Sequence, residues 1–470
     1  MKKMLMALSL SGALLGGSAV VWAEDAASAP VTAEQTVAVA DNGTTTEVIA
    51  VETPAPVEAA PAAEAVPTVD TGDTAWILIS TALVLLMTIP GLALFYGGMV
   101  RKKNVLSTMM FSLSAAILVS LIWVIAGYSL AFSGTGAYFG DLSKAFLNGV
   151  AFDALSGTIP ESLFVIFQMT FAIITVAIIS GSIADRMKYS AFMAFIAVWV
   201  ILVYAPITHW VWAADGWLFK AGALDFAGGT VVHINSGVAG LVAAYMLGKR
   251  TGLGRESMAP HNLTLTVVGA SLIWVGWFGF NGGSALGAGA RASMAILVTQ
   301  VAAAAAAFSW LVVERVVRGK ASVLGGASGA VAGLVVITPA AGFVGVGGAL
   351  VMGLIGGVVC FWGITALKRL LKADDALDAF GLHAVGGMVG AVLTGIFYSD
   401  EIIKAAGVVL APTFAGQLWV QIEGVLATIV YSGVVTFIIL KVIDLVIGIR
   451  VSADDERMGL DLSQHGERIE

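Results

Sequence analysis

The chain has 470 residues, of which 58% are hydrophobic and only 12% are charged, and it contains 56 glycines. Soluble domains average about 25% charged residues, so this composition excludes an ordinary soluble globular protein. The formal net charge of −7 is gathered largely in the two terminal tails, and no basic patch with interleaved aromatic residues is present, so we expect no nucleic-acid partner. Successive apolar stretches of about 20 residues predict an all-α polytopic membrane protein that lies in a lipid bilayer.

Residues 1–23 have the pattern of a cleavable signal peptide, because Lys2 and Lys3 precede an apolar stretch that ends in the small residue Ala23. Residues 24–74 are rich in Ala, Pro, Val, Thr and Glu, and they contain no Lys, Arg or aromatic residue. Such a segment cannot bury enough apolar surface to offset the entropy lost on ordering. We therefore predict a disordered, exported acidic tail.

Residues 75–449 form the predicted membrane domain, and residues 450–470 form a polar tail after it. The apolar segments of this domain are long enough to cross a membrane as helices. We count eleven of them, at approximately residues 75–99, 105–132, 161–182, 189–213, 226–248, 262–281, 291–317, 322–339, 343–370, 379–398 and 417–448.

Basic residues occur in alternate connections, which predicts the orientation of the segments. The connections after the odd-numbered segments are rich in Lys and Arg, whereas the others hold only Lys144, Lys220, Arg291 and Lys404. By the positive-inside rule the first set is cytoplasmic, so the N-terminus is periplasmic and the C-terminus cytoplasmic. The sequence thus predicts a multi-pass protein of the bacterial inner membrane.

Two Gly-rich apolar stretches each hold one histidine and each open with an aspartate. Asp225 opens the stretch that contains His233, and Asp378 opens the stretch that contains His383. An ionisable side chain inside a membrane is costly and by default marks a site or a pathway. The duplicated context favours such a role, although each histidine could instead donate to a backbone carbonyl and only join two helices.

An internal repeat is indicated by these two stretches and by a second pair. Residues 95–98 (FYGG) in the first segment correspond to residues 280–283 (FNGG) in the sixth, just as the fifth segment corresponds to the tenth. Because each half has an odd number of spans, the halves must face opposite ways across the membrane. The pattern predicts a five-plus-five inverted repeat with one added C-terminal helix, and a site near the midplane between the halves.

Four stretches resemble signature sequences of the ammonium transporter family (Amt/Mep/Rh), in its bacterial Amt branch. They are residues 88–107, 223–235, 277–285 and 378–387. The resemblance implies a channel-like transporter for ammonium uptake, which recruits ammonium at an outer aromatic site, deprotonates it and conducts ammonia past paired histidines. It also implies a homotrimer and a PII-type signal protein at the cytoplasmic face. No cofactor and no metal are implied.

The resemblance also assigns residues of the pore. The paired histidines fall on His233 and His383, and two stacked gate phenylalanines fall on Phe167 and Phe280. Ammonium can shed a proton and continue as neutral ammonia, an option that potassium lacks, and each imidazole nitrogen can donate or accept a hydrogen bond. The pair therefore offers a basis for selectivity over potassium.

The outer recruitment site falls, by the same resemblance, on Trp212, Phe171 and Ser284, and an acidic residue near the outer mouth falls on Asp225. Aromatic faces replace part of the hydration of a cation, at about 0.5 to 2 kcal/mol each. Trp is, however, enriched at membrane interfaces without any binding role. An Asp at the start of a helix can cap its free N–H groups, and for Asp225 we favour that role over direct contact with the cation.

Three alternative functions stay open. The first is an ammonium sensor of the same fold that signals through a cytoplasmic partner, and the second is a Rhesus-like channel for neutral gas, which the motifs of the Amt branch disfavour. The third is an enzyme, for which the sequence offers no nucleophile–base set, no Gly-rich phosphate loop and no metal-ligand spacing beyond the two separated histidines. Cys360 is the single cysteine, so an intrachain disulfide is excluded.

Overall fold

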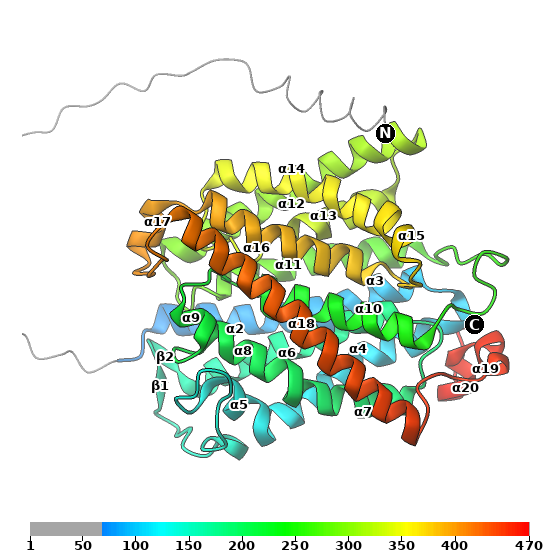
Figure 1. Ribbon diagram of the computed structural model, residues 1–470, viewed down its shortest axis with the longest axis horizontal. Helices are drawn as coiled ribbons and strands as arrows, with labels where there is room; N and C mark the ends of the chain where they lie inside the picture. Colours follow the sequence, from blue (N-terminus) through cyan, green and yellow to red (C-terminus); the bar gives the residue numbers. More distant parts are fainter. Residues whose placement is uncertain (1–67, 470) are drawn as a thin grey trace, which may run out of the picture.

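The computed structural model describes residues 68–469, so the predicted signal peptide and residues 24–67 of the predicted exported tail lie outside the described residues. The described chain is a bundle of long helices that cross the molecule side by side (Figure 1). One short antiparallel hairpin joins β1 (Leu155–Ser156) to β2 (Ile159–Pro160). The predicted helical membrane fold is confirmed.

Ten helices within residues 68–469 are long and apolar enough to cross a membrane. An eleventh apolar helix, α13 (Val323–Ile337), occupies the predicted eighth segment but has only 15 residues. At a rise of 1.5 Å per residue it is about 22 Å long, less than a bilayer core of about 30 Å. A buried turn at residues 338–344 continues the chain inside the bundle.

Wider π-helical turns interrupt or open the first, second, fourth and fifth segments, whereas the third is one continuous α-helix. The first two contain α2 (Thr71–Leu86), η1 (Met87–Leu92), α3 (Ala93–Met99), η2 (Lys102–Asn104), α4 (Val105–Ile122), η3 (Trp123–Gly127) and α5 (Tyr128–Phe132). After η4 (Ala145–Leu147) and the hairpin come α6 (Glu161–Ile183), α7 (Tyr189–Trp199), η5 (Val200–Tyr204), α8 (Ala205–Trp212), α9 (Trp217–Lys220), η6 (Gly229–Ile234) and α10 (Asn235–Leu247).

The second half of the bundle also consists of α-helices, with π-helical turns at two places. Its sixth to ninth segments contain α11 (Leu263–Gly283), α12 (Ala290–Arg318), α13, α14 (Val346–Trp362), η7 (Gly363–Leu367) and α15 (Lys368–Leu371). The chain then forms η8 (Phe380–Ala384), α16 (Val385–Phe397), α17 (Asp400–Ala405), α18 (Phe414–Val446), α19 (Ala453–Met458) and α20 (Leu460–His465). The long helix α18 crosses the bundle diagonally (Figure 1).

Two pairs of π-helical turns lie at matching places in the two halves, whereas η1 and η3 have no counterpart in α11 and α12. η5 and η7 interrupt the fourth and ninth segments, and η6 and η8 open the fifth and tenth. The two matched pairs agree with a five-plus-five repeat. Wide turns of this kind interrupt the regular backbone hydrogen bonds of an α-helix and frequently occur at functional sites. Here η6 carries His233 and η8 carries His383.

Small residues let the first and sixth segments approach closely. A Cβ added to Gly269 of α11 would collide with the backbone of Phe95 in α3, and one added to Gly98 would collide with Thr266. In lipid the hydrophobic effect does not drive helices together, so close backbone approach through small residues becomes important. The FYGG and FNGG stretches therefore lie on two helices that are in direct contact.

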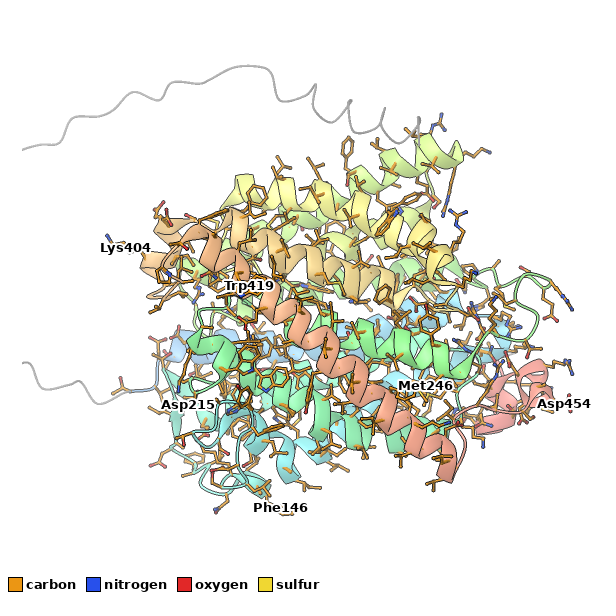
Figure 2. All side chains as sticks on the ribbon, in the orientation of Figure 1. Phe146, Asp215, Met246, Lys404, Trp419 and Asp454 are labelled. Carbon is orange, nitrogen blue, oxygen red and sulfur yellow. The ribbon has the colours of Figure 1, made fainter. Side chains whose placement is uncertain are left out.

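The bundle has two different ends, which are visible in Figure 2 through their charged residues. Asp215 and Lys404 lie at one end, together with β1 and β2, and we call it the hairpin end. Asp454 lies at the opposite end with α19 and α20, and we call it the tail end.

Part of the C-terminal tail is packed against the bundle, although residues 466–469 are exposed. In α20, the carboxylate of Asp461 accepts from the backbone N–H of Ser107 at 2.7 Å, and it thereby caps the first turn of α4 from a distant part of the chain. Leu460 donates its N–H to Asn104 Oδ1 at 2.8 Å. Leu460 and Asp461 are both buried. The predicted polar tail is thus part of the folded tail end.

Candidate functional site

The two predicted pore histidines lie against each other inside the bundle. His233 Nδ1 is 3.2 Å from His383 Nδ1, and the ring centroids are 5.3 Å apart at an interplanar angle of 27°. Both side chains are buried, and among the described residues neither ring is bonded to a backbone carbonyl. One Nδ1 must donate while the other accepts, so the neutral pair holds two different tautomers and shares one hydrogen between these atoms.

Asp225 fixes the helical turn that carries His233. Its carboxylate accepts four backbone N–H groups, those of Gly228 (2.9 Å), Gly229 (2.6 Å), Thr230 (2.8 Å) and Val231 (3.1 Å). Burial raises the pKa of Asp225, and the four backbone donors oppose that rise. These bonds occupy the free N–H groups at the start of η6, which is the capping role expected of this residue.

The matching turn of His383 is fixed by Asp375, and not by Asp378, which opens the stretch in the sequence. Asp375 accepts from the N–H of Phe380 at 2.9 Å and from the hydroxyl of Ser182 at 2.7 Å. Asp225 and Asp375 each precede their histidine by eight residues. That shared spacing, rather than the position at the start of the apolar stretch, identifies the capping carboxylate.

An aromatic ring covers one side of the pair. The ring of Trp277 lies nearly parallel to that of His233, with centroids 5.4 Å apart and an angle of 18°, and its Nε1 donates to Thr338 Oγ1 at 2.9 Å. His233 Nε2 is buried and has no hydrogen-bond partner among the described residues. Buried polar atoms are nearly always paired with protein, water or a ligand. His383 Nε2 likewise makes no hydrogen bond with the described residues, and His383 lines a cavity, so both Nε2 atoms of the pair are left for a ligand.

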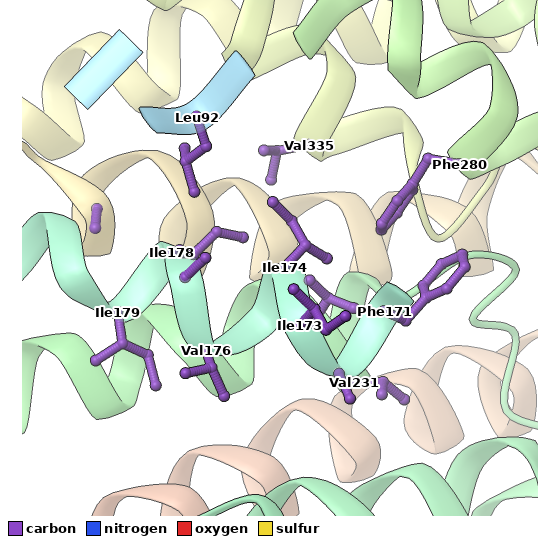
Figure 3. Close-up of a cluster of buried hydrophobic side chains, with 14 of the residues drawn as sticks. Leu92, Phe171, Ile173, Ile174, Val176, Ile178, Ile179, Val231, Phe280 and Val335 are labelled. Carbon is purple, nitrogen blue, oxygen red and sulfur yellow. The ribbon is translucent and has the colours of Figure 1, made fainter. Parts of the chain in front are cut away.

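A narrow apolar cavity adjoins His383. Its lining includes Leu92, Phe95, Ile174, Ile178, Trp277 and Val331. Figure 3 shows how Leu92, Ile174 and Ile178 continue from the rings of Phe171 and Phe280 along the same path. Side chains of this kind cannot replace the hydration of an ion, but they tolerate a small neutral molecule.

The stacked phenylalanine pair differs from the one expected. Phe280 lies against Phe171, with ring centroids 4.4 Å apart and an angle of 30°. Phe167 contacts Phe171 at 5.1 Å with its ring tilted by 71°. Phe167 and Phe171 are four residues apart and share one face of α6. The depth of α6 relative to α11 decides which of them meets Phe280, and local sequence does not encode that depth.

The predicted recruitment residues gather at the hairpin-end side of these rings. Trp212 meets Phe171 edge-on at 5.6 Å and 88°, and its Nε1 donates to the carbonyl of Asp225 at 2.8 Å. With the indole N–H occupied, the half-buried ring has its face left for a ligand. Ser284 caps the end of α11 and donates its hydroxyl to the carbonyl of Phe280 at 2.8 Å, so its oxygen keeps lone pairs for a donor.

The sequence reasoning missed two residues of the site. Trp277, which packs on His233, lies within residues 277–285, one of the stretches that resemble the family, but the resemblance does not assign it a role in the site. Asp375 was passed over because a second carboxylate stands nearer to the apolar stretch. Comparing the two histidine segments residue by residue would have found Asp375 through the spacing of eight.

Comparisons with known proteins agree with this geometry. The sequence profile described as the Ammonium Transporter Family matches residues 75–469. The chain is 51% identical to the ammonium transporter of Bacillus subtilis (strain 168) over 399 residues, which cover 84% of this chain and 98% of that protein. It is 47% identical to the ammonium transporter of Aquifex aeolicus (strain VF5), with 85% and 93% of the two chains covered.

Solved structures show the same likeness. The crystal structure of Saccharomyces cerevisiae Mep2 superposes with a TM-score of 0.77 at 38% identity, over 82% of this chain and 88% of that one. A protein described as a Sensor Amt Protein superposes with a TM-score of 0.78 at 30% identity, over 84% of this chain and 98% of that one.

Proposed function

The chain belongs to the ammonium transporter family and is a transporter rather than an enzyme; from that premise we propose that ammonium gives up its proton to an imidazole nitrogen of the paired histidines and passes them as ammonia. The observation that carries the proposal is the buried contact between His233 and His383, in which the Nε2 atom of each ring has no partner among the described residues. A charged group at the centre of a bilayer costs about 2.5 to 3.5 kcal/mol on insertion scales. Ammonia avoids that cost, and each free imidazole nitrogen gives it a hydrogen-bond partner in an apolar cavity.

Recruitment begins, in this proposal, at the hairpin end. The face of Trp212 and the neighbouring ring of Phe171 attract ammonium, and each aromatic face contributes about 0.5 to 2 kcal/mol. The oxygen of Ser284 accepts one hydrogen bond from the cation. Asp225 acts through structure, because all four backbone bonds of its carboxylate point into η6, and its charge only adds a favourable field.

The gate is formed by Phe171 and Phe280, because these two rings stack across the path between the recruitment residues and the histidines. Phe167 supports Phe171 from α6 and is a backing ring rather than a stacked partner. A closed stack excludes water and hydrated ions. Transport therefore requires a brief separation of the two rings.

The bacterial inner membrane is the proposed location, with the hairpin end facing the periplasm and the tail end facing the cytoplasm. The alternation of basic connections supports this orientation. Reporter fusions after Lys103 and after Lys404 should read cytoplasmic and periplasmic respectively. The remaining proposals are a homotrimeric assembly and a PII-type signal protein at the tail end.

The histidine mechanism is tested by substitutions in the pair. His383→Ala should lower ammonium uptake about 100-fold or more, the range of a lost acid–base group, while the protein still assembles. His233→Asp keeps a proton acceptor but adds negative charge, so potassium should begin to compete with ammonium. His261→Ala is the matched control, because His261 lies in a connection outside the pore, bonded to the carbonyl of Val100. Parent-level uptake by a folded His383→Ala protein would exclude the mechanism.

A sensor function is the second candidate, since the Sensor Amt Protein shares this fold at 30% identity. Reconstituted liposomes separate the two functions. A transient current on addition of ammonium indicates electrogenic transport. Silence, alongside a working pH-based uptake assay, indicates neutral ammonia conduction, and failure of both assays in folded protein indicates a sensor.

A further inference from the structure

The first turn of α2, at the hairpin end, lies outside the pore residues described above and joins two segments that lead to them. Asp73 lies in this turn, and its two carboxylate oxygens accept from distant parts of the chain. Oδ1 accepts from the backbone N–H of Ala288 at 2.7 Å, and Oδ2 accepts from the hydroxyl of Thr158 at 2.5 Å. Ala288 is 215 positions from Asp73 in the sequence, and Thr158 is 85 positions from it. One side chain therefore holds two connections of the hairpin end together.

The first of these connections begins with Ser284, which supplies the hydroxyl of the recruitment residues. Ser284 ends α11, and Ala288 lies four residues after it. Trp76 lies three residues after Asp73 on the same side of α2. Its Nε1 donates to the carbonyl of Gly282, two residues before Ser284, at 3.1 Å. Ser284 therefore lies between two contacts with α2, one on each side of it in the sequence.

The second connection leads to the aromatic rings of the recruitment site. Thr158 lies in the hairpin between β1 and β2, three residues before Glu161, where α6 begins. The same helix carries Phe171. The backbone of Thr158 is held as well, because its carbonyl accepts from the N–H of Asp70, the N-cap residue of α2, at 2.9 Å. The start of α2 therefore holds the entry to α6 by two hydrogen bonds.

We propose that Asp73 is a positioning residue for ammonium recruitment, which fixes the spacing between Ser284 and Phe171; this inference rests on the proposed function. Ser284 comes from the end of α11 and Phe171 from α6, so one small cation meets both groups only when the two helices keep a constant separation. Side chains that bind a ligand keep their spacing when hydrogen bonds behind them fix the segments that carry them. Asp73 does not touch ammonium, and it acts through the two connections.

The competing explanation is long-range attraction of ammonium by the negative charge of Asp73. Asp73→Asn separates the two roles, because the amide oxygen can still accept from Ala288 and the amide NH2 group can donate to the hydroxyl oxygen of Thr158. Both connections are then kept without the charge. Asp73→Ala removes the bonds and the charge together, whereas Thr158→Val removes one bond and leaves the charge in place.

The test is the ammonium concentration that gives half-maximal uptake by the full-length protein in liposomes, at constant ionic strength. Asp73→Ala should raise this concentration about fivefold and leave the maximal rate unchanged, because weaker capture lowers affinity without altering the step at the histidines. Thr158→Val should raise it as well, and Asp73→Asn should stay closer to the parent than to Asp73→Ala. Asp400→Ala is the matched control, because Asp400 is an exposed acid of α17 at the same end whose carboxylate has no hydrogen bond or ion pair with the described residues.

A second measurement judges Asp73 apart from transport. Ammonium that binds the folded protein raises its melting temperature, so the ammonium concentration at half of that rise reports recruitment alone. Asp73→Ala should increase this concentration by the same factor as in uptake. A parent protein that binds ammonium without transporting it would exclude the proposed transport, and the binding curves of the variants would still decide the role of Asp73.

Three outcomes would overturn the role of Asp73. One is an equal half-saturating concentration for the parent and folded Asp73→Ala, in uptake and in binding. Another is a lower maximal rate with an unchanged half-saturating concentration, which would make Asp73 a general structural residue. The third is an Asp73→Asn protein that matches Asp73→Ala, which would assign the effect to charge. If Asp73→Ala does not assemble on a sizing column, the exposed and isosteric substitution Thr158→Val gives the decision.

Discussion

The starts of the fifth and tenth segments share one backbone plan but use two different sets of polar partners. In each, a carboxylate stands eight residues before the histidine, and a residue of positive φ stands five before it, Gly228 at 112° and Asp378 at 63°. In the fifth segment, the carboxylate of Asp225 accepts four backbone N–H groups of the same segment. The tenth depends on Ser182 of α6 and on the pairing of Asp378 with Lys368.

This difference teaches that a repeat preserves backbone geometry more strictly than side-chain chemistry. The turn of His233 is satisfied within its own segment, so its stability is largely local. The turn of His383 has one such bond within its own segment, from the N–H of Phe380, and its other polar partners are Ser182 and Lys368, so its stability depends on how α6 and α15 pack. Substitutions at matched positions should therefore have unequal effects in the two halves.

The largest contrast is expected between Asp225→Asn and Asp375→Asn. An amide offers one acceptor oxygen, so at Asp225 at least two of four buried N–H groups lose their partner, at about 1 to 3 kcal/mol each. At Asp375 one oxygen still serves one of two donors, and we expect a loss of about 1 to 2 kcal/mol. Thermal unfolding and size-exclusion chromatography measure both. Equal destabilisation would contradict the comparison.

A smaller contrast is expected at the two residues of positive φ. At Gly228 an added Cβ would lie 2.6 Å from a methyl carbon of Val232, and the φ of 112° disfavours any side chain, so Gly228→Ala should cost about 1 to 3 kcal/mol. Asp378→Gly relieves a left-handed conformation and loses a partly exposed ion pair, so its net effect should stay within about 1 kcal/mol. The shift in melting temperature measures both effects. A larger loss of stability for Asp378→Gly than for Gly228→Ala would contradict the expected order.

The smallest effect is expected from Ser182→Ala, which removes one donor from Asp375 and should cost about 1 kcal/mol. Ser180→Ala is the control on the same buried helix, because the hydroxyl of Ser180 bonds only within α6, to the carbonyl of Ala177. If the two variants melt at the same temperature, the bond between α6 and the turn of His383 contributes no more than a bond within α6.

Much of the architecture could be predicted from the sequence, because the length of an apolar segment and the presence of an ionisable residue within it can be read locally. The lengths of the apolar segments predicted the spans, and the isolation of His233 and His383 in apolar stretches predicted a paired site. The contact of Phe280 with Phe171 instead of Phe167 could not be predicted, since it depends on how deep α6 lies against α11. The short length of α13 could not be predicted from the sequence either, because the buried turn after it is as apolar as the helix.

The cap on α4 has a consequence for how the protein is made. Asp461 is separated by 354 positions from Ser107, the residue whose N–H it accepts. During synthesis the second span is made long before Asp461, so water takes the place of Asp461 at the N–H of Ser107 until that residue arrives. Completion of the tail end thus depends on residues that are made much later than the helix they cap. A prematurely terminated product keeps an exposed, frayed helix start that proteolytic surveillance can recognise.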